Sequence, residues 1–303
     1  MLYGAPALAD VKVSTGSEAG SYHAAFGDIV KICGLPLEEW TSKGSNENIE
    51  RAARNQTHAF FAQTDALFVY DGSVRKLDNI KTIISLYPEE VHFVTPVESK
   101  FRKKGFTSFG EKVFNTVGDL GGYPVGVIAG SGSQTTAEFI ADKLKSGSTP
   151  FYEVRTYQNE DALKNAVASG QVAAAVLVGG QPLGSVEKYG PAFKILPVDD
   201  GIISRLSKYY DTSKLSYSKM NAKGTITLAT SSGIFGRTLN DKEKLAVFAA
   251  IRQCVTEKIG TFQDDGIPKW ADVKPEEHGR WSWMDLPSPQ SAAAPEAKVK
   301  KRK

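Results

Sequence analysis

Three loops rich in glycine and hydroxyl side chains could bind an anion without any Lys or Arg. They cover residues 14–21, 44–48 and 130–136, and each stands between an expected strand and an expected helix. The first N–H groups of a helix have no partner within it, and the helix dipole adds partial positive charge there. Such loops can therefore receive an anion. Helix capping alone would explain any one loop, but loops in both halves of the chain favour a shared ligand site at the carboxyl ends of the strands.

Four basic side chains are candidates for direct pairing with an anion: Lys43, Arg51, Arg54 and Arg155. Arg155 lies two residues before Tyr157, so a strand would point both side chains to one face. A solvated surface charge is the simpler interpretation of the other three. Arg155 therefore stays as the candidate.

Signatures of catalysis are missing from the sequence. The four histidines, His23, His58, His92 and His278, are far apart and lack metal-ligand spacing. Neither a Gly-x-Ser-x-Gly elbow nor a Walker loop occurs, and Gly130-Ser131-Gly132-Ser133 lacks the Lys that would reach phosphates. We predict that the chain is not an enzyme and uses no cofactor or metal.

Short apolar runs alternate with helical periodicity from residue 11 to about residue 200, which is typical of α/β construction. We expect strands at residues 11–14, 35–41, 59–62, 80–87, 91–97, 123–129, 151–156, 172–178, 193–198 and 225–229. We expect helices from residue 21, after residues 44–46, and at 65–70, 137–144, 161–168 and 241–259, with a helical turn starting at Pro182. The aromatic-rich residues 261–286 should pack over a surface.

The length of 303 residues predicts two lobes, because a single core rarely grows beyond about 250–300 residues. Residues 91–97 and 193–199 are the expected crossings between them. We predict a signal-peptide remnant at 1–9, lobe I at 10–95 plus 200–286, lobe II at 96–199, and a disordered basic tail at 287–303.

Composition and termini indicate an exported protein that does not bind nucleic acid. The formal net charge is only +3, and the dense basic run at residues 298–303 lies in a polar tail. No window offers the roughly 18 apolar residues of a membrane helix. Ala7-Leu8-Ala9 before Asp10 has the form of a signal-peptidase site, although an ordinary Ala-rich start is the alternative. Cys33 and Cys254 could form a disulfide or remain two buried thiols.

A set of short motifs, in order, resembles the TAXI family, the solute-binding subunits of TRAP transporters. In the first half they are Ser14-Thr15-Gly16-Ser17, Gly20-Ser21-Tyr22, Gly44-Ser45-Asn46-Glu47-Asn48, Phe61-Ala62-Gln63-Thr64-Asp65-Ala66 and Leu86-Tyr87-Pro88-Glu89. In the second half they are Asp119-Leu120-Gly121-Gly122, Gly130-Ser131-Gly132-Ser133-Gln134-Thr135-Thr136, Ala162-Leu163-Lys164 and Val178-Gly179-Gly180-Gln181-Pro182. The resemblance covers residues 11–199 and fades beyond them.

This resemblance implies a type II periplasmic-binding-protein fold: α/β, with a ligand cleft between two lobes joined by two crossing strands. It implies a periplasmic protein that captures a small organic anion, glutamate- or dicarboxylate-like, and passes it to a TRAP-type permease. By motif position, and including the Arg155–Tyr157 face, the ligand would meet Gly16, Ser17, Tyr22, Ser45, Asn46, Gln63, Asp65, Ser131, Ser133, Thr135, Thr136, Arg155, Tyr157, Gly179 and Gln181. His23 stands where the family pattern has a second aromatic residue or a Pro-Val pair, which leaves the ligand class open.

Two other functions remain open from the sequence. Hydroxyl-rich helix starts suit tetrahedral anions equally well, so an ABC-type receptor for phosphonate, phosphite or sulfonate is one alternative. An enzyme or a sensor built on the same fold is the other, because a fold does not determine a function.

Overall fold

The computed structural model describes residues 11–18, 20–98, 101, 112–220 and 222–287. The predicted signal-peptide remnant at 1–9 lies outside the described residues, as does all but the first residue of the predicted tail at 287–303. Within the described residues, no helix is long and apolar enough to cross a membrane.

Lobe I is built on three parallel strands flanked by helices. Strands β1 (Val11–Ser14), β2 (Leu37–Trp40) and β3 (Ala59–Gln63) lie in the order β2-β1-β3. They alternate with α1 (Ser21–Cys33), α2 (Ser45–Ala53) and α3 (Thr64–Ser73), and α8 (Lys242–Glu257) packs near α1. The expected strand–loop–helix alternation is confirmed here. Tyr22, Phe26 and Ile29 form the buried stripe of α1, as their spacing of three and four predicts.

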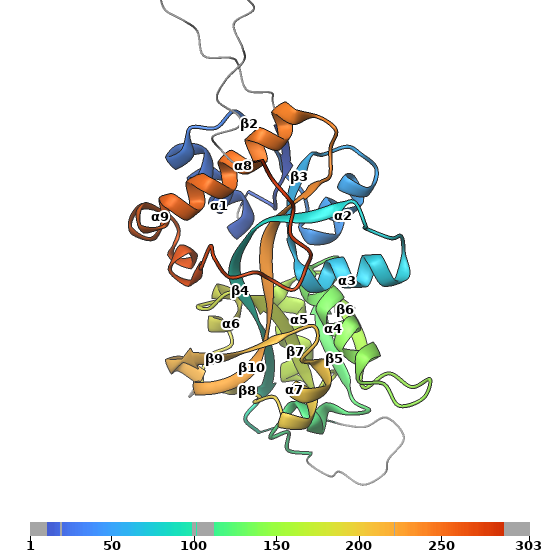
Figure 1. Cartoon of the computed structure of the whole chain (residues 1–303). Coiled ribbons are helices and arrows are strands. Elements are labelled where there is room, and N and C mark those ends of the chain that lie inside the picture. Colours follow the sequence, from blue (N-terminus) through green and yellow to red (C-terminus); the bar gives the residue numbers. More distant parts are fainter. Residues whose placement is uncertain (1–10, 19, 99–100, 102–111, 221, 288–303) are drawn as a thin grey trace, which may run out of the picture.

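Two long antiparallel strands run through both lobes (Figure 1). They are β4 (Ile80–Pro96) and β10 (Ala222–Arg237), and they join all the strands into one sheet with the central order β3-β10-β4-β7. The two strands expected at 80–87 and 91–97 are thus one continuous strand. The second crossing is β10, and the expectation that 193–199 would cross is wrong, because β8 (Phe193–Ile195) pairs only with residues Val94 to Pro96 of β4.

Lobe II repeats the parallel design. Strands β5 (Pro124–Ile128), β6 (Glu153–Tyr157) and β7 (Ala174–Gly179) lie in the order β7-β5-β6. Helices α4 (Gly132–Lys143) and α5 (Glu160–Ala168) connect them, while η1 (Val117–Leu120), α6 (Gly184–Glu187), α7 (Asp200–Leu206), β9 (Asp211–Tyr217) and η2 (Ser218–Met220) complete the lobe. Helix α4 starts five residues before the expected Ala137, since Ser131 accepts a hydrogen bond from the Gln134 N–H as its N-cap.

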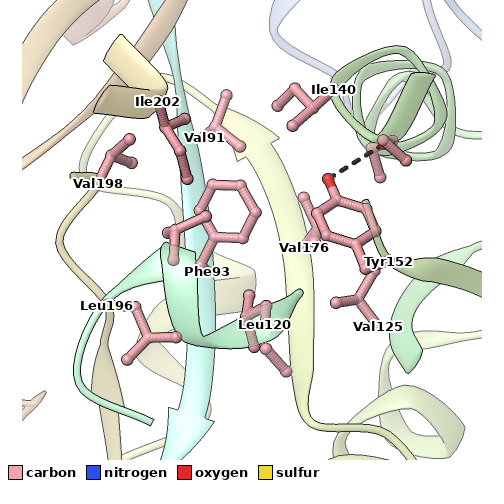
Figure 2. Packing of buried hydrophobic residues seen from close by; sticks show 14 of the residues in the cluster. Val91, Phe93, Leu120, Val125, Ile140, Tyr152, Val176, Leu196, Val198 and Ile202 are labelled. Carbon is pink, nitrogen blue, oxygen red and sulfur yellow. Dashed lines mark hydrogen bonds between the residues drawn. The ribbon is translucent and has the colours of Figure 1, made fainter. Parts of the chain in front are cut away.

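Lobe II has its own core, shown in Figure 2. Phe93 of β4, Val176 of β7 and Ile202 of α7 belong to one buried cluster, and the Tyr152 hydroxyl donates to the Ala137 carbonyl. Side chains of β9, such as Leu215, are buried in a second cluster of this lobe with residues of α5 and β7. We therefore propose that the boundary between the lobes lies within β10 rather than at residue 200.

The aromatic-rich C-terminal segment packs across the hinge strands. After α9 (Ile259–Asp265) and η3 (Pro268–Asp272), the chain crosses in front of β4 in Figure 1. The Arg280 guanidinium donates to the Tyr210 carbonyl, 3.2 Å away, and pairs with Asp211, both in lobe II. Trp281 packs edge-on against Phe68 of α3. The segment therefore contacts both lobes.

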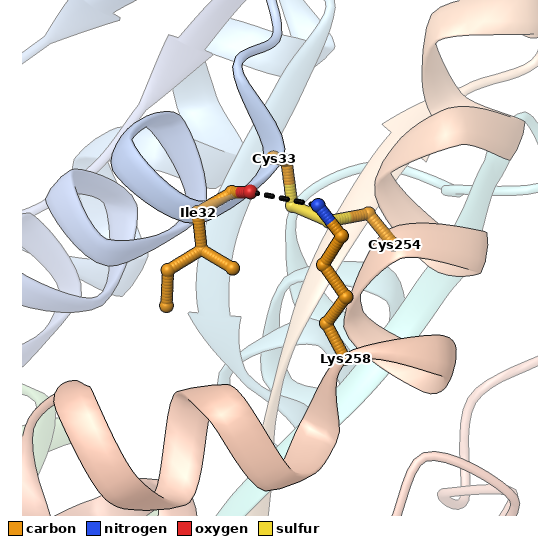
Figure 3. The surroundings of a disulfide bond; sticks show 4 residues. All are labelled: Ile32, Cys33, Cys254 and Lys258. Carbon is orange, nitrogen blue, oxygen red and sulfur yellow. Dashed lines mark hydrogen bonds between the residues drawn. A yellow bond between two sulfur atoms is a disulfide. The ribbon is translucent and has the colours of Figure 1, made fainter.

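A disulfide joins α1 to α8, two helices of lobe I that lie far apart in the sequence. Cys33 ends α1 and Cys254 lies in the last turns of α8, with Cα atoms 5.9 Å apart (Figure 3). Lys258 Nζ donates to the Ile32 carbonyl at 3.0 Å beside it. Of the two states left open by the sequence, the structure has the disulfide.

Removal of this cross-link should destabilise lobe I. The bond closes a loop with a sequence separation of 221 residues, so a Cys33→Ala, Cys254→Ala double variant should lose about 2–5 kcal/mol of unfolding free energy. Urea denaturation measures this loss. A reductant should shift the wild-type midpoint in the same direction and leave the double variant unchanged, and equal midpoints for all four samples would contradict the prediction.

Candidate ligand-binding site between the lobes

The sheet topology directs the helix starts of both lobes toward one another. Strands β1 and β3 run parallel to each other and antiparallel to β10, whereas β5 and β7 run antiparallel to β4 in the other lobe. Because β4 and β10 are themselves antiparallel, the carboxyl ends of all four shorter strands point to the boundary between the lobes. The loops that follow those strands, including 14–21 and 130–136, therefore line this interface.

The start of α4 touches lobe I through two polar side chains. Asn46 Nδ2 donates to Thr135 Oγ1 at 2.7 Å, which links the 44–48 loop to the 130–136 loop. A Cβ atom at Gly132 would overlap the amide oxygen of Gln63, so glycine lets that amide approach the main chain of α4. The structure thus brings together residues that the sequence analysis had placed in one site.

Asp65 provides a third link between the lobes and is fully buried. Its Oδ2 accepts hydrogen bonds from Thr136 Oγ1 at 2.6 Å and from the Tyr210 hydroxyl at 2.9 Å, both in lobe II. Its Oδ1 accepts from the Ala66 N–H at 2.9 Å. Burial raises the pKa of Asp65, and the hydrogen bonds from Thr136 and Tyr210 oppose that rise. Asp65 therefore binds the two lobes together and has few acceptor sites left for a ligand.

Several buried polar atoms have no protein partner among the described residues: Ser14 Oγ, Tyr22 Oη, Asn48 Oδ1, Tyr87 Oη, Tyr189 Oη and Trp283 Nε1. Of these, Tyr22 and Tyr87 lie close to each other and to Glu89, and Tyr22 also lies close to Ser45. The amide nitrogen of Asn48 is occupied, since it donates to the carbonyls of Thr15 and Phe61. Buried polar groups are nearly always hydrogen-bonded to protein, water or ligand. The neighbouring Tyr22 and Tyr87 hydroxyls are therefore suited to a polar solute.

Glu89 of β4 lies within the same interface and was missed by the sequence analysis as a site residue. Its side chain is only 7% exposed, and the Tyr22 and Tyr87 side chains lie close to it. Burial raises the pKa of Glu89 to about 7, while the nearby Lys269 ammonium opposes the rise. Lys269 Nζ donates to the Gly180 carbonyl of lobe II at 3.2 Å. The Leu86-Tyr87-Pro88-Glu89 motif was the available signal for Glu89, and none existed for Lys269.

Two hydroxyls expected to face the ligand are used within lobe II. Ser131 Oγ donates to the Ile128 carbonyl at 2.7 Å and caps α4, and Ser133 Oγ accepts from the Val178 N–H at 2.9 Å. They hold the start of α4 against the ends of β5 and β7. Ser45 has a similar role in lobe I, where its Oγ accepts from the Gln63 N–H at 3.1 Å.

Comparison with known proteins identifies the architecture. No protein-family model matches the chain, and no curated protein matches its sequence. The GluR0 ligand-binding core of Nostoc punctiforme, in complex with L-glutamate, superposes with a TM-score of 0.52 at 14% identity over 87% of this chain and 100% of that one. This chain has the two-lobed type II periplasmic-binding-protein fold.

Two further binding proteins are similar to this chain. The substrate-binding protein of an amino acid ABC transporter has a TM-score of 0.49 at 12% identity, covering 86% of this chain and 99% of that one. A mutant of ArgBP from T. maritima has a TM-score of 0.49 at 16% identity, covering 87% and 96%. In the binding-protein fold found here, the predicted α/β class and the pair of crossing strands are confirmed.

Some predicted contacts lie away from the contacts that join the lobes. Arg155 is exposed on the edge strand β6, where it pairs with Glu153 at 2.9 Å and donates to the Gln171 carbonyl at 3.0 Å. Arg155 and Tyr157 do share a face, but it is the face covered by α5, since Tyr157 and Leu163 both lie against Gly126. Arg155 is thus already neutralised at the surface, and the expectation that it binds the ligand is wrong.

The remaining predicted residues differ in their contacts and exposure. Gly16 lies against the Tyr22 side chain, while Ser17 is exposed at the outer rim. Gly179 ends β7, and the Gln181 side chain is bonded to β9 through the Lys214 carbonyl and the Ser216 N–H. His23 pairs with Glu39 at 2.8 Å rather than with another site residue.

A cavity of about 610 Å³ lies between the hinge strands, β9 and the C-terminal segment, and none of the residues predicted for the ligand lines it. Its walls include Ser85, Ser231, Asp211 and Arg280. No group of three His, Cys, Asp or Glu side chains able to hold a metal ion occurs within the part of the chain that the structure describes.

The Asp65–Thr136 contact should favour the closed arrangement of the lobes. Thr136→Val removes a hydrogen bond to a buried carboxyl group, a change that costs about 1.5–3 kcal/mol. Because the bond crosses the interface, the ligand-free variant should populate a more open form, with a larger radius of gyration in small-angle X-ray scattering.

Thr95→Val is the matched control for this variant. The Thr95 hydroxyl is equally buried, but it bonds to the Ala173 carbonyl within lobe II, so its loss should lower stability without opening the lobes. Identical scattering curves for Thr136→Val and Thr95→Val would refute a role for the Asp65 contact in closure.

Proposed function

We propose that this chain is an extracytoplasmic solute-binding protein whose two lobes close over a small organic anion, glutamate- or dicarboxylate-like. The proposal rests on one observation above all: the buried hydroxyls of Tyr22 and Tyr87 have no hydrogen-bond partner and lie beside Glu89 and Ser45, next to the Asn46–Thr135 contact that joins the helix starts of the two lobes. The likeness of the fold to the glutamate-bound GluR0 core is consistent with it.

The interface offers uncharged donors for an anionic group. The N–H groups at the start of α4 carry the partial positive charge of a helix of twelve residues, and the hydroxyls of Tyr22 and Tyr87 are buried without a partner on the lobe I side. With Arg155 paired at the surface, helix starts and hydroxyls remain the natural partners of a carboxylate. This is binding by main-chain dipoles rather than by a fixed guanidinium.

Binding without chemical conversion is the simpler role for these groups. Glu89 has a pKa near neutrality, as some catalytic acids do, but Asp65 is held by Thr136 and Tyr210. None of the histidines in the described residues is placed there as a base: His92 is buried in lobe II against Tyr217, His23 pairs with Glu39, His58 bonds to the Lys12 N–H, and His278 stacks on Trp283. A solute recovered unchanged after incubation, by mass spectrometry, is the expected result.

Other observations support the proposed location and transport partner. The Cys33–Cys254 disulfide suits an oxidising compartment such as the periplasm. Delivery to a TRAP-type permease rests on the motif resemblance of residues 11–199 to the TAXI family. A TRAP permease encoded beside this chain would support that partner, whereas an ABC permease there would favour the receptor alternative.

A thermal-shift screen tests the proposal directly. The panel should hold dicarboxylates, amino acids, phosphonates, sulfonates and neutral sugars. A true ligand at about one hundred times its Kd should stabilise the protein by about 2.7 kcal/mol, which raises the Tm measurably. Dicarboxylates or acidic amino acids are the expected hits. Stabilisation by phosphonates or sulfonates alone would favour the ABC-type receptor. Stabilisation by sugars alone would refute the proposal that the ligand is an anion.

The contact between Gln63 and Gly132 gives a second test. Gly132→Ala adds a methyl group that overlaps the buried Gln63 amide, an overpacking that costs about 1–3 kcal/mol in the closed form only. Affinity for the best hit of the screen, measured by calorimetry, should fall by about tenfold or more.

A double-mutant cycle separates this clash from other effects. In a Gln63→Ala background, the same Gly132→Ala change should cost almost nothing, since the overlapping amide is gone. An equal loss of affinity in both backgrounds would mean that the lobes do not close through this contact.

A further inference from the structure

Glu89 is a buried acid whose position in the interface is not explained by structural pairing. It lies on β4 opposite Thr230 of β10, where the two hinge strands pass between the lobes. Within the described residues it forms no ion pair, although 7% exposure leaves it little contact with water. A buried carboxyl group without a countercharge is costly, and natural proteins rarely keep one without a use.

The groups around Glu89 are arranged as the wall of a polar site. Tyr22 from α1 and Tyr87 from β4 are both buried, and neither hydroxyl has a hydrogen bond of normal geometry, although the Tyr22 hydroxyl lies close enough to Glu89 to lower the pKa of that carboxyl. The charged groups near Glu89 are Asp65 from α3, Lys269 from η3 and Glu90, which follows it on β4 and bonds on the other face of the strand to the Gln181 N–H and to Ser213. The local charge is therefore predominantly negative.

Lys269 does not neutralise Glu89 by direct contact. Its Nζ atom donates to the Gly180 carbonyl at 3.2 Å and lies 5.2 Å from the centre of the Tyr87 ring. The ammonium is thus engaged with lobe II and with an aromatic face, and it forms no ion pair with Glu89 in the described part of the chain. A second cation beside Glu89 would find an acid, two hydroxyls and the Tyr22 and Tyr87 rings.

We infer that Glu89 binds the ammonium group of the solute, so that the ligand is an amino acid and not a simple dicarboxylate. This inference rests on the proposed function and chooses between its two ligand types. The carboxylate of the amino acid would bind the donors at the helix starts, and its ammonium would pair with Glu89. A dicarboxylate, in contrast, would bring a second anion toward Glu89 and Asp65.

Pairs of probes that differ only by an amino group test the inference. They are L-glutamate with glutarate, L-aspartate with succinate, and L-leucine with isocaproate, each titrated into the full chain by calorimetry at neutral pH. The best amino acid should bind at least about tenfold more tightly than its partner without the amino group, the factor that corresponds to about 1.4 kcal/mol. An analogue without the amino group that binds as tightly as its amino acid would overturn the inference and leave the proposed function intact.

Glu89→Gln keeps the shape of the side chain and removes its charge. In this variant the ratio of the affinity for the amino acid to the affinity for its analogue without the amino group should shrink to less than about threefold. Glu153→Gln, an exposed acid paired with Arg155 on β6, is the control and should keep the wild-type preference. Retention of the full preference by Glu89→Gln would overturn the inference. If no probe of either kind and no solute of the thermal-shift panel binds, the proposed function itself fails.

The pH dependence of binding to the wild-type protein provides a second measurement that needs no variant. Burial raises the pKa of Glu89 to about 7 in the free protein, and only the ionised carboxylate pairs with an ammonium. Affinity for the amino acid should therefore fall by up to about tenfold per pH unit below pH 7 and level off above it. Glu89→Gln should lose this dependence. An affinity for the amino acid that does not change between about pH 5.5 and about pH 8 in the wild type would contradict the inference.

Discussion

The antiparallel pairing of β4 with β10 is the constraint on which the rest of the molecule depends. These two strands continue from one lobe into the other, and the parallel strands of each lobe pair next to them in the same sheet. Every parallel strand next to them must then run toward the boundary, and the helix that follows it must start there. The register shift between Ser231 and Gly233 lies at the crossing itself, where the ladder has to bend between two separately packed sheets. Convergence of the helix starts is thus a consequence of strand direction and needs no special sequence in the loops.

The groups that close the interface differ from the groups that could hold a solute. Asp65 is saturated by Thr136, Tyr210 and its own helix, and Asn46 is occupied by Thr135. These contacts stabilise closure through protein atoms alone. The hydroxyls of Tyr22 and Tyr87 have no such partner although they are equally buried. These contacts already stabilise the closed form, so a ligand has to supply less free energy to close the lobes. A ligand changes the equilibrium between the open and closed forms only by the difference between its affinities for them.

Much of this arrangement could be predicted from the sequence, and the failures have physical causes. The loops at 14–21, 44–48 and 130–136 were predictable because glycine, hydroxyl residues and a change from strand to helix periodicity occur together. Strand β10 was mostly missed because its hinge residues, Thr230-Ser231-Ser232-Gly233, are polar and small, so only residues 225–229 resembled a strand. Arg155 shares a face of β6 with Tyr157 as expected, but nothing in local sequence indicates that Glu153 and the Gln171 carbonyl bind its guanidinium at the surface. Glu89 and Lys269 come together only through tertiary packing, which spacing along the chain cannot reveal.

The charge of the interface limits what it can bind. Helix starts and hydroxyls favour one anionic group at lobe II's α4, while Glu89 and Asp65 disfavour a second anion near the hinge. Lys269 offsets only part of that negative charge, because it lies against Tyr87 and Gly180 instead of against a carboxylate. A solute with separated positive and negative groups matches this distribution, whereas a dianion would require Glu89 to remain protonated on binding. The interface therefore has hydrogen-bond donors at its α4 side and an acid on β4. This arrangement arises because the fold gives these groups no charged partner within the protein.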